Sequence, residues 1–125
     1  MTHVIIREDC GNSPKNRFVQ DLTIAFARRD IPYILDSVSD DICWIRPGEK
    51  TLQGKAELAA VLEKLDRVAE ITVYHAFTHG KTGAVNGVMQ LENGQSIAFC
   101  DVYVFSNAKG SSVSEVTTYQ VTTDR

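Results

Sequence analysis

Residues 40–54 have the sequence DDICWIRPGEKTLQG, and the organisation of the whole chain can be argued from this stretch. The pattern from Ile42 to Arg46 is typical of a short strand, which the following Pro-Gly pair ends before a helix begins at Gly54. Because side chains alternate along a strand, Trp44 and Arg46 lie on the same face. We expect this aromatic side chain and this cation to stand at the rim of a closed pocket.

Composition favours one globular domain without a nucleic-acid or membrane role. The 125 residues are 43% hydrophobic and 23% charged, with a net charge of −3. Lys and Arg are scattered, whereas nucleic-acid binding usually requires a basic face. No apolar run is long enough to span a membrane, and the N-terminal residues do not resemble a signal peptide. The three cysteines are an odd number with no CxxC pair, which disfavours a zinc site and indicates reduced thiols in a cytoplasmic protein.

Helices are expected in the first half of the chain. Residues 1–12 form a leader, in which Val4 to Ile6 can pair as an edge strand. Ser13 followed by a proline is typical of a helix start, and so is Asp30 with a proline two residues later. A third helix is expected from Gly54 to about Asp66, with leucines at helical spacing.

Strands are expected in the second half, where the hydrophobic period changes to two. We predict four strands, over residues 70–79, 84–91, 96–105 and 112–122. Asn93-Gly94 is a strong signal for a two-residue hairpin turn. Simple alternation along the first strand places His75 on the same inward face as Ile71 and Val73.

The order of these elements predicts an α+β fold, a cone-shaped roll in which three N-terminal helices pack on a curved, mostly antiparallel sheet. A long sheet covered by only three helices is expected to curl around them and to leave an apolar interior that is open at one end. Such a hollow is typical of small-molecule pockets. We therefore expect a single domain over residues 13–125, preceded by the leader.

Four segments carry a resemblance to a known group of proteins. These are DDICWIRPG at residues 40–48, Gly54-Lys55 at a helix start, HGKTGAVNG at 79–87 and FCDVYVF at 99–105. Together they resemble the nuclear-transport-factor-2-like superfamily over about residues 13–122. This superfamily includes ketosteroid isomerases, SnoaL-type polyketide cyclases, scytalone dehydratase and limonene epoxide hydrolase. It hosts several chemistries and many binding proteins, so that function has to be argued from the site.

Comparison with ketosteroid isomerases implies that this chain keeps one of their three catalytic groups. Arg46 matches the position of their general base, but an arginine stays protonated and cannot abstract a proton. Asp101 matches the protonated aspartic acid of their oxyanion hole. The position of their tyrosine falls on or near Leu22, which has no hydroxyl. The resemblance therefore implies a relative that is not itself a ketosteroid isomerase.

Asp101 is the first candidate catalytic residue, because it shares a strand face with Phe99 and Tyr103. An unpaired carboxyl group among apolar side chains has a raised pKa and can donate a hydrogen bond or transfer a proton. The alternative is a structural carboxylate held by backbone amides or by Arg46. A pair with Arg46 would keep Asp101 ionised, and it could orient a water molecule as in limonene epoxide hydrolase.

His75 is the candidate base, since its ordinary pKa lies near neutrality. Its separation from His79 is about 13 Å along a strand, which is too far for a shared metal ion. Candidate ligand-binding residues are aromatic or cationic side chains that the pattern places near the hollow. They are Trp44, Arg46, Tyr33, Tyr103, Phe99 and Tyr119. Each aromatic ring also has a purely structural interpretation as part of the core, and Arg46 has one as a solvated rim residue.

The function predicted from the sequence is binding of a small, largely apolar molecule in the cone. Catalysis would then be proton transfer without a cofactor, of the isomerase, dehydratase or cyclase type. The alternative is a non-catalytic ligand-binding or protein-interaction module. The outer face of the sheet carries Cys100, Val102 and Val104, with Val116 or its neighbours beside them. Because such an apolar face needs cover, we predict a homodimer through it.

Overall fold

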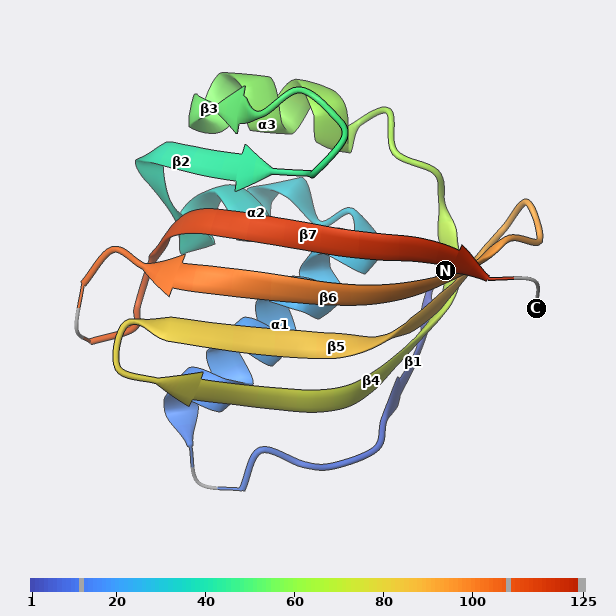
Figure 1. Ribbon diagram of the computed structural model, residues 1–125, viewed down its shortest axis with the longest axis horizontal. Helices are drawn as coiled ribbons and strands as arrows, with labels where there is room; N and C mark the ends of the chain where they lie inside the picture. Colours follow the sequence, from blue (N-terminus) through green and yellow to red (C-terminus); the bar gives the residue numbers. More distant parts are fainter. Residues whose placement is uncertain (12, 108, 124–125) are drawn as a thin grey trace.

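A curved seven-stranded sheet forms the body of the computed structural model, which describes residues 1–11, 13–107 and 109–123 (Figure 1). The helices are α1 (Pro14–Arg28), α2 (Ile31–Ser37) and α3 (Gly54–Leu62). The strands are β1 (His3–Ile6), β2 (Val38–Ile45), β3 (Leu52–Gln53), β4 (Val68–His79), β5 (Thr82–Leu91), β6 (Ser96–Phe105) and β7 (Val113–Thr123).

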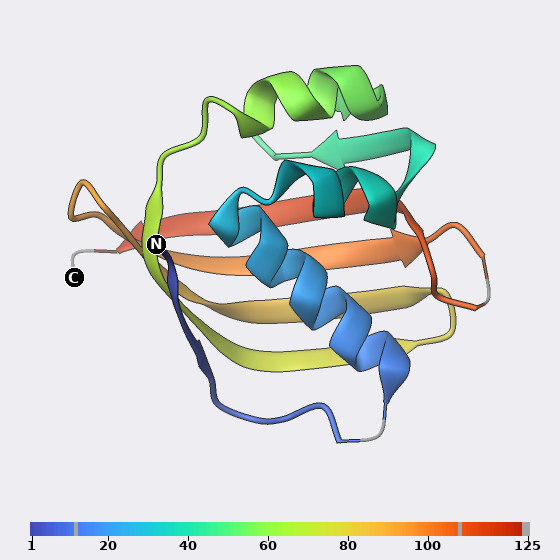
Figure 2. The ribbon, with the colours of Figure 1, turned by 180° about the vertical axis from the view of Figure 1, so that it is seen from behind.

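The strands follow the order β1-β4-β5-β6-β7-β2-β3 across the sheet. Strands β4 to β7 are joined as antiparallel neighbours, while β1 pairs in parallel with β4 and β2 in parallel with β7. Figure 2 shows the helices on the concave side, where α1 crosses the central strands. This arrangement confirms the predicted α+β roll and the edge strand expected at Val4 to Ile6.

The helix starts follow the capping signals in the sequence. The Ser13 side chain accepts a hydrogen bond from the backbone N–H of Asn16, and the Asp30 side chain accepts one from Tyr33. The expected end of α3 near Asp66 was wrong, because the helix ends at Leu62. The guanidinium of Arg29 donates to the backbone carbonyls of residues 63 and 65, so the chain after Leu62 turns toward α1 instead of continuing the helix.

A β-bulge in β4 reverses the inward and outward faces of its second half. The pairing between β4 and β5 shifts between Val73, which is opposite Gly87, and His75, which is opposite Asn86. An extra residue in one strand bends it and changes which face the following side chains occupy. His75 therefore lies exposed on the outer face, where its Nδ1 is 3.2 Å from Oδ1 of Asn86. The prediction that His75 points inward was wrong for this reason.

The β5–β6 hairpin also differs from the expected two-residue turn. The backbone N–H of Leu91 donates to the carbonyl of Gln95, which leaves three residues in the loop. Gly94 is the last of these, with φ of +96°, a conformation that suits glycine in three-residue hairpins.

The interior is solid at one end and hollow at the other. Side chains of α1, β6 and β7 fill the end near the start of α1, and Val19, Leu22, Tyr103 and Val113 are fully buried there. The other end lies beneath the second half of α1, and there the side chains leave a cavity. None of the helices in the described part of the chain is long and apolar enough to cross a membrane.

Candidate functional site

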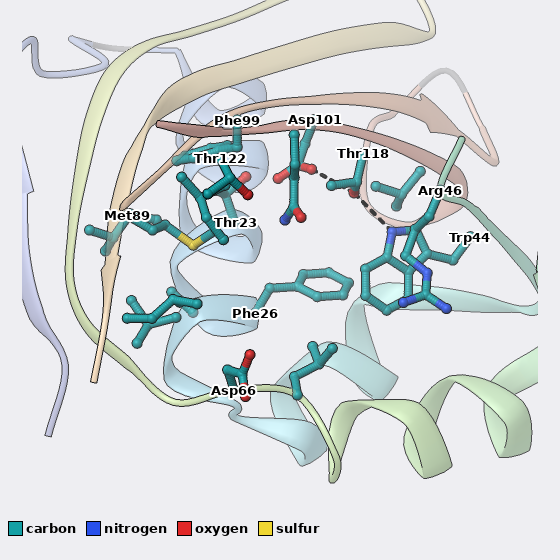
Figure 3. A pocket seen from close by; sticks show the side chains of 18 of the residues that line it. Thr23, Phe26, Trp44, Arg46, Asp66, Met89, Phe99, Asp101, Thr118 and Thr122 are labelled. Carbon is teal, nitrogen blue, oxygen red and sulfur yellow. Dashed lines mark hydrogen bonds between the residues drawn. The ribbon is translucent and has the colours of Figure 1, made fainter. Parts of the chain in front are cut away.

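A cavity of about 340 Å³ opens at the hollow end of the roll (Figure 3). Its wall is formed by α1, by the end of β2 with the loop that follows, by the segment between α3 and β4, and by strands β4 to β7. The lining residues that are buried include Trp44, Phe99 and Asp101. Those that are exposed mark the mouth, and they are Pro47, Glu49, Asp66, Gln120 and Thr122.

Asp101 is the buried carboxyl group of this cavity. Only 8% of the residue is exposed, and the hydroxyl of Thr118 donates a hydrogen bond of 2.7 Å to its Oδ1. The indole Nε1 of Trp44 in turn donates to Thr118 Oγ1 over 2.9 Å. Figure 3 shows these three side chains in line along the cavity wall. In the described part of the chain, Oδ2 of Asp101 has no side-chain hydrogen bond and is available to a ligand.

The surroundings of Asp101 favour its neutral form more than water does. Burial raises the pKa of Asp101 to about 6, and the hydrogen bond from Thr118 opposes this rise without cancelling it. A carboxyl group with such a pKa exchanges its proton readily near neutral pH. It can therefore act as a base when it is ionised and as an acid or hydrogen-bond donor when it is neutral.

The cavity has one apolar side and one polar stripe. The ring centroids of Phe26 and Trp44 lie 5.3 Å apart on the apolar side, where a flat hydrocarbon can pack. The polar stripe runs along β7, because Thr118, Gln120 and Thr122 all line the cavity. In the sheet they pair with inward-facing residues of β6, namely Asp101, Phe99 and Ile97 respectively.

Arg46 lies at the mouth and does not pair with Asp101. The backbone N–H of Glu49 donates to the carbonyl of Arg46 and closes a turn, in which Gly48 has φ of +90°. Arg46 Nη1 is 3.8 Å from Glu49 Oε1, and its guanidinium carbon lies 4.9 Å from the centre of the Trp44 ring. The alternative in which Arg46 holds Asp101 ionised is thereby excluded.

Tyr103 lies behind the cavity wall rather than in it. Its hydroxyl is 2.5 Å from Oγ1 of Thr23, and the Thr23 hydroxyl donates to the carbonyl of Val19. Because the single proton of Thr23 is used in that bond, Tyr103 is the donor to Thr23. The residue is fully buried and does not line the cavity, so the structure gives it a packing position and not the expected contact with ligand.

The predicted site residues therefore separate into two groups. The structure brings Asp101, Trp44, Arg46 and Phe99 together around the cavity. It places the others elsewhere: Tyr33 and Tyr119 are exposed, Tyr103 is in the core, and His75 is on the outer face. Sequence reasoning missed Thr118 and Gln120, which follow from alternation on β7 once the register of that strand is known.

No group of three His, Cys, Asp or Glu side chains within residues 1–11, 13–107 and 109–123 could hold a metal ion. Asp101 can perform acid–base chemistry with its own carboxyl group, next to an apolar wall.

Comparison with protein families gives a match to the SnoaL-like domain over residues 17–113. The chain belongs to the SnoaL-like family. A search of curated proteins found no significant match. This SnoaL-like domain has the same fold as many solved structures of NTF2-like proteins.

Three of these structures illustrate the range of functions on the fold. An NTF2-like protein of unknown function from Burkholderia xenovorans has 19% identity and a TM-score of 0.75, with 89% of this chain and 86% of that chain covered. An LEH-like epoxide hydrolase of M. tuberculosis has 17% identity and a TM-score of 0.70, with 86% and 82% covered. The epoxide hydrolase/cyclase-like enzyme SalBIII, described in pyran ring formation in the polyether salinomycin, has 14% identity and a TM-score of 0.71, with 86% and 90% covered. At such identities the likeness establishes the fold alone.

Proposed function

We propose that this protein binds a small, largely apolar molecule in the cavity and that Asp101 transfers a proton to or from it without a cofactor. The observation that carries this proposal is the buried Asp101 carboxyl group, whose Oδ2 has no side-chain partner in the described chain and whose pKa is raised to about 6. The cavity volume of about 340 Å³ is at the small end of the range for ligand pockets.

In this mechanism the two carboxyl oxygens of Asp101 have different roles. Oδ1 is held by Thr118, which Trp44 orients in turn, so the plane of the carboxyl group is fixed. Oδ2 takes a proton from a carbon or hydroxyl group of the ligand and returns it to another atom of the same molecule. The hydrocarbon wall around Phe26 excludes water from this exchange. The isomerase, dehydratase or cyclase type of reaction is consistent with solved neighbours that are described as epoxide hydrolase or cyclase-like.

A non-catalytic binding domain is the competing proposal. The position that matches the tyrosine of ketosteroid isomerases falls on or near Leu22, which is fully buried in the core. Arg46 stands at the position of their base. Both positions therefore lack the catalytic group of the ketosteroid isomerases, which favours a protein that binds a ligand without converting it. Detection of a catalysed reaction decides between the two proposals.

A general substrate for proton abstraction tests the catalytic proposal. The flat aromatic compound 5-nitrobenzisoxazole opens when a base removes its carbon-bound proton, the N–O bond breaks and a phenolate forms. We expect the wild-type protein to accelerate this reaction, with a rate that rises with pH through about 6 as Asp101 ionises. Asp101→Asn should lower the rate constant by about 100-fold, in the range of general-base contributions.

The matched control is His75→Asn, because that imidazole lies on the outer face. It should leave the rate unchanged. Equal rates for wild type and Asp101→Asn would reject the catalytic role of Asp101 and favour the binding domain.

We also propose that the chain forms a homodimer through the outer face of the sheet. Val102 and Val104 of β6 are half-buried there, and farther along the same face the exposed side chains of Tyr119 and Val121 on β7 lie opposite Cys100 and Ala98. Val116 does not belong to this face, because it is buried against the cavity. An apolar area on two neighbouring strands is suited to a second copy of the same sheet.

Light scattering tests this assembly. The wild-type protein should have about twice the mass of the 13.9 kDa chain. Tyr119→Lys, which changes an exposed side chain and so leaves the fold intact, should give the monomer mass. A monomeric wild-type protein at high concentration would contradict the proposal.

A further inference from the structure

The guanidinium of Arg46 has few hydrogen-bond partners among the described residues. Arg46 is the only cation that the described residues supply to the cavity wall. Its side chain is 20% exposed, and among the described residues the carboxylate within ion-pair distance of it, that of Glu49, lies at 3.8 Å, beyond the length of a charge-assisted hydrogen bond. The Nε atom is buried and has no hydrogen-bond partner among the described residues. Buried donors are nearly always paired in native proteins, so an unpaired one at a cavity requires an explanation.

The contact with Trp44 fixes the guanidinium without using its hydrogen-bond donors. The guanidinium carbon lies 4.9 Å from the centre of the indole ring. Interaction with an aromatic ring involves the π face, whereas the N–H groups of a guanidinium point outward in its own plane. The contact therefore holds the side chain at the mouth, and the two terminal Nη groups, which make no hydrogen bond among the described residues, are left for a planar, two-oxygen acceptor.

The two acidic side chains at the mouth do not cancel this charge inside the cavity. Glu49 is 65% exposed at its side chain, and Asp66 is also exposed. Water screens exposed charges strongly, while a cation that is mostly buried is screened much less. Among the charges at the mouth, that of Arg46 is therefore the least screened, and it favours a negative ligand group beside Trp44. The buried Asp101 carboxylate, with a pKa of about 6, carries its own negative charge elsewhere on the cavity wall at neutral pH, so the negative ligand group belongs at Arg46 and not at Asp101.

We propose that the ligand of this cavity is a small apolar carboxylic acid, whose carboxylate binds the guanidinium of Arg46 while its hydrocarbon body packs on Trp44 and Phe26. This inference rests on the proposed function and narrows its substrate class. The Trp44 indole contacts Arg46 through its face and reaches Asp101 through Thr118 by its Nε1. A molecule that lies along this indole presents its carboxylate to Arg46 and its far end to Asp101.

Three probes of the same shape and different charge test the inference. They are cyclohexanecarboxylate, cyclohexanecarboxamide and cyclohexylmethylammonium, which carry −1, 0 and +1. Trp44 is the only tryptophan in the chain, so its fluorescence reports directly on the cavity. We expect the dissociation constant of the carboxylate to be at least about tenfold lower than that of the amide. A hydrogen bond to a charged partner is stronger than one between neutral groups by about the free energy that corresponds to a tenfold change in affinity. The ammonium should bind most weakly.

Two variants at the mouth separate the role of Arg46 from that of the cavity. Arg46→Gln should remove the preference for the carboxylate and leave binding of the amide nearly unchanged. Glu49→Gln removes the competing carboxylate from an exposed position and should tighten binding of cyclohexanecarboxylate by a few-fold, as expected for a weak surface pair. Because Glu49 is exposed, this variant remains informative if Arg46→Gln fails to fold.

The outcomes distinguish this inference from the proposed function. Equal binding of carboxylate and amide, or a preference for the ammonium, overturns the carboxylic-acid ligand and leaves an apolar cavity with Asp101 intact. A carboxylate preference that survives in Arg46→Gln also overturns it. Failure of all three probes to change the Trp44 fluorescence overturns this inference and the proposed binding of small apolar molecules together.

Discussion

Asp101→Asn is expected to raise the free energy of unfolding at pH 8 by up to about 3 kcal/mol, the equivalent of a shift in pKa from 3.8 to about 6. Most substitutions of buried polar residues destabilise a protein. Here the ionised carboxylate is itself unfavourable, because burial removes its hydration and the described chain provides no cation to pair with it. The amide oxygen of Asn can still accept the hydrogen bond from Thr118.

The pH dependence of this effect has a definite sign. The pKa of Asp101 is higher in the folded state than in the unfolded state, so the folded state binds the proton more tightly. Its contribution to stability is fully present below pH 4 and is lost as the pH rises to about 6. The advantage of Asp101→Asn should therefore be near zero at pH 4 and largest at pH 8. Urea denaturation at a series of pH values measures it, with the exposed Asp36→Asn as the control.

A different result would assign Asp101 a structural role. If Asp101→Asn is less stable than wild type at pH 8 by as much as at pH 4, the carboxylate is held by favourable interactions. The residue would then not be a proton-transfer group in a hollow interior.

Gly87→Ala is expected to lower the free energy of unfolding by at least about 4 kcal/mol or to prevent folding. Changes of this size are seen when a substitution causes a severe steric clash or a defect in the core. A Cβ atom on Gly87 would lie 2.0 Å from the backbone carbonyl oxygen of Thr72 on β4. No rotation of a side chain relieves a clash with backbone. Gly87 is opposite Val73, where the bulge begins, so the close approach of β4 and β5 belongs to the bend that forms the roll.

Gly94→Ala provides the matched comparison for this prediction. Gly94 has a positive φ, but a Cβ atom there would meet nothing within 4 Å. Its replacement should cost about 1 to 2 kcal/mol from backbone strain alone. Urea denaturation of both variants measures the two losses. A smaller loss for Gly87→Ala than for Gly94→Ala would mean that β4 and β5 do not approach as closely as the structure has them.

The helix starts and the alternation of β6 were predictable, because each depends on residues close together in sequence. Ser13 and Asp30 cap helices through contacts three residues away. Strand β6 pairs with β5 without a break in register, so counting by twos along β6 correctly placed Asp101 and Phe99 inside.

The position of His75 was not predictable, because the bulge depends on a glycine in the partner strand. Simple alternation along β4 assigns side chains to the wrong faces beyond the point where Gly87 allows the close approach of the neighbouring strand. The polar stripe of β7 was missed for a similar reason. The register of β7 against β6 shifts between Val104 and Phe105, and alternation cannot locate Thr118 before that shift is known.

Aromatic side chains gave the least information about the site. Tyr33, Tyr103 and Tyr119 have the same candidate role in the sequence, yet one is fully buried and two are exposed. The pairing of Arg46 was also open, since the turn that follows β2 brings Glu49 toward it rather than Asp101. Both questions depend on tertiary placement, which local pattern does not contain.

The most direct measurement is the pKa of the Asp101 side chain, followed through its carboxyl carbon by NMR and assigned with Asp101→Asn. A carboxyl group that faces a hollow apolar interior should titrate at about 6. Titration near the ordinary value of about 3.9 would place this group in water and would contradict both the hollow and the proposed chemistry.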